Sequence, residues 1–117
     1  MDNSILATIR QLVVGSDDTS FDLDLRIHIN TAFSFLWQMG VGPTTPFKIV
    51  DESAVWSDFI TDDDKLESVI TYIYAKVKLV FDPPANATLV SALNQTISEC
   101  EWRLNNVSDP AYSETKE

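Results

Sequence analysis

The sequence predicts an all-α fold in which about four helices form a small bundle. Apolar residues recur at intervals of three and four over most of the chain, capping residues precede these stretches, and Gly or Pro follows them. The chain of 117 residues is long enough for one domain. We expect this domain at 1–106 and a flexible tail at 107–117, where periodicity is lost.

The first helix is expected over 4–14. Its apolar positions fall on one stripe, which consists of Ile5, Leu6, Ile9, Leu12 and Val13. Asn3 or Ser4 can cap its start, and Gly15 stands where helices commonly end. These features together predict a short amphipathic helix.

The second helix is expected over 21–39, although its first half, FDLDLRIHIN, alternates like a half-buried strand. Beyond it, apolar residues are too dense for such a strand, and Thr19 or Ser20 can cap a helix. As a helix, it carries one continuous apolar face: Leu25, Ile29, Ala32, Phe33 and Leu36, and Trp37 is also expected in the core. Leu23 and Ile27 then lie on a second face. A small helix with two apolar faces needs cover from another chain, so we predict both residues at an interface.

The segment 40–61 begins with glycines and prolines that interrupt the helical pattern, so we expect it to protrude. It can hold a short strand near Phe47 or a helical turn that presents Trp56 and Phe59. These three aromatic residues are further candidates for contacts with another chain. For Trp56 the sequence leaves a place in the chain's own core equally open.

Helices over 63–81 and 87–105 are expected to form an αα-hairpin. Acidic TDDD precedes the third helix, DPP ends it, and Asn86 can cap the fourth. The fourth helix has an apolar stripe at steps of mostly four residues: Leu89, Leu93, Ile97, Cys100 and Leu104. The short connection folds the two helices back on each other.

The composition argues against several functional classes. Eighteen acidic residues against eight basic ones give a net charge of −10, which repels nucleic-acid phosphates and suits a basic partner or a surface past which DNA slides. No apolar run approaches the ~20 residues of a membrane span, and we identify no signal peptide. The single Cys100 excludes an intrachain disulfide and fits a cytoplasmic protein.

Candidate catalytic and metal-binding groups have simpler structural interpretations. Asp62, Asp63 and Asp64 fit the start of a helix better than a metal site, and His28 has no evident catalytic partner. Cys100 is expected to pack as a small hydrophobic residue. We therefore expect a protein that is not an enzyme, with no catalytic residue, no bound metal and no cofactor.

Several segments, in their order and spacing, carry a family resemblance: FDLDLRIHINTAFSFLWQMGVG, VWSDF, YIYAKVKLVFDPP and ISECEWRL. From about Ile5 to Asp109 the chain resembles the head–tail connector proteins of long-tailed bacteriophages, also called adaptor or head-completion proteins. None of these segments is a catalytic motif.

The resemblance implies a structural virion protein at the head–tail interface, made in the host bacterial cytoplasm. It implies a homo-oligomeric ring under the portal that matches the portal symmetry, extends the DNA channel and docks the next head-completion, stopper or tail protein. DNA would pass through without specific binding, and no membrane is involved. The tail, with Tyr112, would order against the portal protein. The alternative is an acidic DNA mimic or regulatory protein with a basic partner, which predicts carboxylates concentrated on one exposed face.

Overall fold

The computed structural model describes residues 4–108, and within this range the chain forms five α-helices and no β-strand. The helices are α1 (Ile5–Val13), α2 (Asp22–Gln38), α3 (Trp56–Phe59), α4 (Asp63–Phe81) and α5 (Ala87–Ser108). The expected all-α class is confirmed, and the four longer helices agree with the predicted ranges to within three residues at each end.

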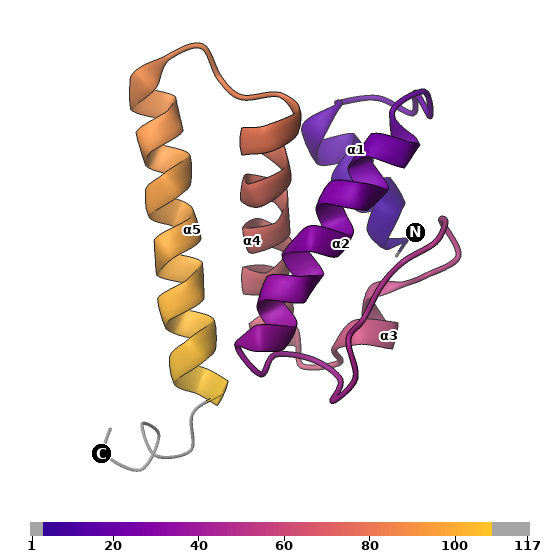
Figure 1. Cartoon of the computed structure of the whole chain (residues 1–117), viewed down its shortest axis with the longest axis vertical. Helices are drawn as coiled ribbons and strands as arrows, with labels where there is room; N and C mark the ends of the chain where they lie inside the picture. Colours follow the sequence, from indigo (N-terminus) through magenta and orange to yellow (C-terminus); the bar gives the residue numbers. More distant parts are fainter. Residues whose placement is uncertain (1–3, 109–117) are drawn as a thin grey trace.

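Helix α4 lies between the other long helices (Figure 1). Helices α1 and α2 pack against each other and against one side of α4, and α5 packs on the other side as the second arm of a hairpin. Helix α5 and the α1–α2 pair therefore form opposite edges of the molecule.

Helix α2 explains the strand-like alternation at its N-terminal half. Its buried residues are the predicted face: Leu25, Ile29, Ala32, Phe33 and Leu36. Leu23 and Ile27 lie on the other side of the helix and are 61% and 51% exposed. The alternation thus arises from a helix with apolar residues on two faces, one of them uncovered in the single chain.

Two details of the predicted α2 are wrong. Neither Thr19 nor Ser20 caps the helix; the N-cap position is Phe21, which offers no side-chain hydrogen bond, and the Asp22 carboxylate is bound by Arg10. Trp37 is 42% exposed, because Leu36 occupies the core position. The Trp37 indole instead donates a hydrogen bond from Nε1 to the carbonyl oxygen of Thr44, at 3.0 Å.

The segment between α2 and α4 runs back along α2 (Figure 1). Its extended part is attached to α2 by the Asn30 side chain, which donates to the carbonyl oxygen of Ile49 at 3.0 Å and accepts from its N–H at 2.8 Å. The predicted helical turn is α3, whereas the strand alternative is not formed. The tip of the segment, residues 50–53, is exposed, as are Thr44, Thr45 and Pro46, whereas Ile49 is buried and Ala54 is partly buried.

Helices α4 and α5 form the predicted hairpin, and both predicted caps are confirmed. Asp62 Oδ1 accepts from the N–H of Asp64 at 3.0 Å, and Asn86 Oδ1 accepts from the N–H of Thr88 at 2.7 Å. The hairpin is joined further down by Tyr72, whose hydroxyl donates to Glu101 Oε2 at 3.1 Å. The α5 face toward α4 consists of Leu93, which is partly buried, and the buried Ile97, Cys100 and Leu104.

Candidate subunit interface

The uncovered side of α2 and the tip 50–53 border an open pocket of about 610 Å³. We call it the α2 pocket; it is lined by Leu6, Asp22, Leu23, Arg26, Val50, Asp51, Glu52 and Ser53. Arg26 closes one side, since its Nη1 donates to the carbonyl oxygen of Val50 at 3.2 Å. Apolar Leu23 and Val50 thus lie beside a charged rim, an arrangement that suits contact with another protein surface.

Arg10 organises the base of this region from inside the molecule. The residue is 5% exposed, and its guanidinium donates from Nε and Nη2 to the two carboxylate oxygens of Asp22, at 3.0 and 2.9 Å. Nη2 also donates to Glu52. The hydrogen bond to Asp22, with further support from Glu52, holds the pKa of Arg10 above its ordinary value despite the opposing effect of burial. One buried cation therefore fixes α1, the start of α2 and the tip 50–53 relative to one another.

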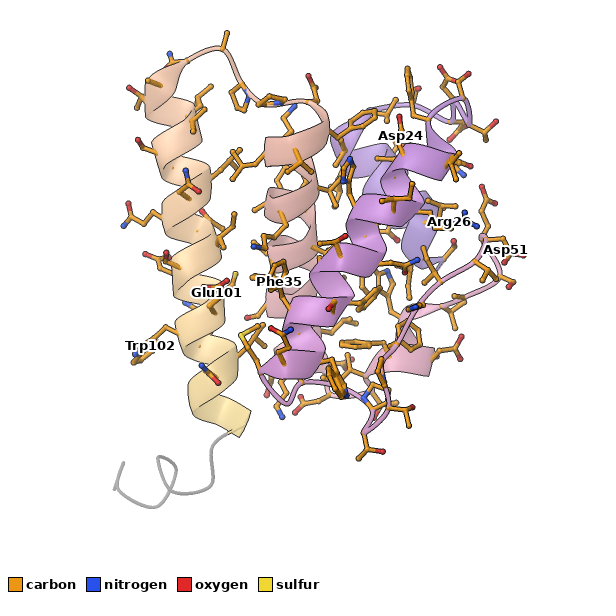
Figure 2. All side chains as sticks on the ribbon, viewed as in Figure 1. Asp24, Arg26, Phe35, Asp51, Glu101 and Trp102 are labelled. Carbon is orange, nitrogen blue, oxygen red and sulfur yellow. The ribbon has the colours of Figure 1, made fainter. Side chains whose placement is uncertain are left out.

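This arrangement brings together acidic residues that are far apart in the sequence, since Asp22 lines the α2 pocket together with Asp51 and Glu52. Figure 2 shows Arg26 and Asp51 at the same edge of the molecule, with Asp24 above them near the start of α2. The pKa of Asp51 is lowered by hydrogen bonds from Ser53, and Ser20 acts in the same way on Asp18. Both carboxylates are ionised at neutral pH, so the rim of the α2 pocket carries the negative charge of Asp51 as well as the positive charge of Arg26.

Three of the aromatic residues predicted for the interface lie wholly or partly in the subunit's own core. Trp56 and Phe59 are 5% and 4% exposed, and Trp56 Nε1 donates to Thr8 Oγ1 at 3.1 Å. Phe47 is partly buried, with its ring centroid 4.9 Å from that of Phe33 and 5.2 Å from that of Phe59. Trp56 therefore belongs to the core of the single chain, and the segment 40–61 packs the rings of Phe47 and Phe59 against Phe33.

Leu23 and Ile27 are the predicted interface residues that the single chain leaves exposed. Tyr112 lies outside the described residues. Helical spacing alone places Arg26 beside Leu23. No feature of the sequence indicates Val50 and Asp51 as further neighbours, because that contact depends on how the connecting segment folds.

The residues considered as candidate catalytic or metal-binding groups take part in the packing and capping of the helices. Asp62 caps α4, and Cys100 is buried against α4, where burial raises the pKa of its thiol. His28 is half-buried beside Phe35 and Lys76 in a small pocket of about 110 Å³. None of the described helices combines the length and the hydropathy needed to cross a lipid bilayer.

Residues 5–111 match the family model described as "Phage connector protein". The match covers most of the sequence and includes every described helix. No curated protein and no solved structure matches the chain significantly.

Proposed function

Because the chain belongs to the phage connector protein family, we propose that it is a structural subunit of the virion that forms a ring under the portal at the head–tail interface. The ring extends the DNA channel and docks the next head-completion, stopper or tail protein. The partners of the chain are further copies of itself, the portal protein and that next protein, and its role is architectural rather than enzymatic.

The uncovered apolar side of α2 is the observation that carries this proposal. Leu23 and Ile27 are one helical turn apart and mostly exposed, on a helix whose opposite face is fully packed. Covering the area of these two side chains that is still exposed contributes roughly 1–2 kcal/mol each, which is about half of the value for a fully exposed side chain. A structural protein that acts as many copies recovers this contribution at every subunit contact.

The charge of the chain supports a channel role. A net charge of −10 opposes adsorption of the DNA backbone, and a ring multiplies this charge by the number of subunits. DNA can then move through the ring without specific binding.

The acidic DNA mimic is less well supported. Such a protein needs its carboxylates free on one face, yet Asp22 and Glu52 are used internally by Arg10, while Asp62 serves as a helix cap. The family assignment also points to virion assembly.

The direct test is capture of the chain by the portal ring of its own phage, followed by negative-stain imaging. We expect a second ring stacked on the portal. The double variant Leu23→Gln/Ile27→Gln should keep its helix content and lose ring formation, whereas Leu12→Gln, an exposed apolar position on α1, serves as the matched control. Failure of the unmodified chain to bind the portal overturns the proposal.

We further propose that the C-terminal tail, residues 107–117, which contains Tyr112, attaches the subunit to the portal. Leu104 is the last position of the core stripe and is 1% exposed, so truncation after Asn106 preserves the packing of α5 on α4. We expect the truncated chain to fold and to bind the portal more weakly. Unchanged phage assembly with the truncated chain counts against a docking tail.

A further inference from the structure

The outer side of α5 is an unusual surface for so acidic a chain. Trp102 is 63% exposed and projects away from α4 (Figure 2). Ser91, Gln95 and Ser98 precede it at steps of three and four residues, so they lie on the same side of the helix; all three are exposed and uncharged. This side, which we call the α5 outer face, therefore presents one large aromatic residue at the end of a stripe of uncharged residues. The stripe is bordered by Glu99, whose Oε2 accepts a hydrogen bond from Gln95 Nε2 at 3.4 Å.

A closed ring requires two different patches on opposite sides of each subunit, because each copy contacts the next in a head-to-tail manner. The α5 outer face and the α2 pocket satisfy this requirement. Trp102 lies at one edge of the molecule, whereas Arg26 and Asp51 of the α2 pocket lie at the opposite edge (Figure 2).

The two surfaces are also chemically complementary. The α2 pocket offers Leu23 and Val50 as apolar walls and Arg26 as a cation that can stack on an indole ring.

We propose that Trp102 of one subunit inserts into the α2 pocket of the next, so that the α5 outer face and the α2 pocket form the repeating contact of the ring. This inference rests on the proposed ring function and assigns its subunit interface. Tryptophan in a pocket at the centre of a contact is a frequent source of binding energy, and the uncharged serine and glutamine residues that precede it on α5 limit repulsion between two acidic chains.

The test uses two full-length variants, each of which blocks one side of the contact. Trp102→Glu blocks the α5 outer face, and Val50→Glu places a charge in the α2 pocket at a position that is 71% exposed. Leu89→Glu is the matched control, since Leu89 is 55% exposed on α5 but lies on a different side of that helix from Trp102. Assembly is measured by sedimentation velocity of the chain alone and by negative-stain imaging on portal rings, after circular dichroism has verified the fold.

We expect each blocking variant alone to need at least a tenfold higher protein concentration to form rings. The control should assemble like the unmodified chain. A mixture of the two blocking variants should form 1:1 pairs and no ring, because one intact pocket then meets one intact α5 outer face. Ring formation by either variant alone, self-pairing of one variant, or absence of pairs in the mixture overturns this interface and leaves the ring function standing. If the unmodified chain forms a ring neither alone nor on the portal, the proposed function itself fails.

Discussion

Arg10 on α1 binds Asp22 at the start of α2 through both carboxylate oxygens, at 3.0 and 2.9 Å, although the two residues are twelve positions apart. The guanidinium side chain is 7% exposed and the Asp22 side chain 26%. A two-point pair of this kind fixes both the distance and the relative rotation of the two helices. Because Asp22 also lines the α2 pocket, the pair links the subunit core to the candidate interface.

Arg10→Ala is expected to reduce the free energy of unfolding by about 2–3 kcal/mol. The loss is below the ~3–5 kcal/mol typical of a fully buried pair, because the Glu52 side chain is 51% exposed and water can reach it. Urea denaturation followed by circular dichroism measures the change. Arg26→Ala is the matched control, since Arg26 bonds only a carbonyl oxygen at the surface, and an equal loss in both variants would contradict the role assigned to Arg10.

Trp56→Ala should lower the free energy of unfolding by about 3–5 kcal/mol, because the indole is almost fully buried and its hydrogen bond to Thr8 is lost. Trp102→Ala, at the most exposed tryptophan of the described chain, should change it by no more than about 0.5 kcal/mol. Chemical denaturation of both variants provides the measurement. A stable Trp56→Ala protein that fails to assemble would return Trp56 to the interface.

Helix α4 and Trp56 illustrate which features of the fold the sequence predicts and which it does not. Helix α4 was predicted with its correct bounds, because a continuous apolar stripe lies between an acidic cap and two prolines. Trp56 could not be assigned, since periodicity in a four-residue helix is too short to define a buried face. Its hydrogen-bond partner Thr8 lies 48 positions earlier in the sequence. Only the folded course of the connecting segment brings the two residues together.

Arg10 was missed for a related reason. It lies four residues after Leu6 and three before Val13, so its position on the buried side of α1 could have been noticed. Its partners Asp22 and Glu52 belong to two different acidic groups, and composition alone does not indicate which acids are paired inside and which remain at the surface.

The stability of the protein should decrease in alkaline solution through Tyr72. Burial raises the pKa of its hydroxyl above the usual value, and the nearby charge of Glu101 adds to this effect. Above about pH 10 the unfolded chain releases this proton while the folded chain keeps it, so the free energy of unfolding falls by up to about 1.4 kcal/mol per pH unit. Burial of the Cys100 thiol acts in the same direction.

Urea denaturation from pH 8 to pH 11 tests this dependence, with Tyr72→Phe as the comparison. The variant loses one hydrogen bond to Glu101, which costs about 1 kcal/mol at neutral pH. Its free energy of unfolding should then fall less steeply with pH than that of the unmodified chain. Parallel pH profiles would show that Tyr72 does not retain its proton in the folded state.

Gly40 and Gly42 offer a matched pair that tests how tightly the connecting segment packs on the core. Both have positive φ, +81° and +94°, so alanine at either position is strained by about 1–2 kcal/mol. A Cβ at Gly40 meets no atom within 4 Å, whereas a Cβ at Gly42 would lie 2.6 Å from Cζ of the buried Phe59 ring. Phe59 is held between Phe33 and Phe47 and cannot move aside freely.

Gly42→Ala should therefore cost about 1–3 kcal/mol more than Gly40→Ala in urea denaturation. Equal costs would mean that Phe59 packs loosely, and the segment 40–61 would then be free to expose its aromatic residues to a neighbouring subunit.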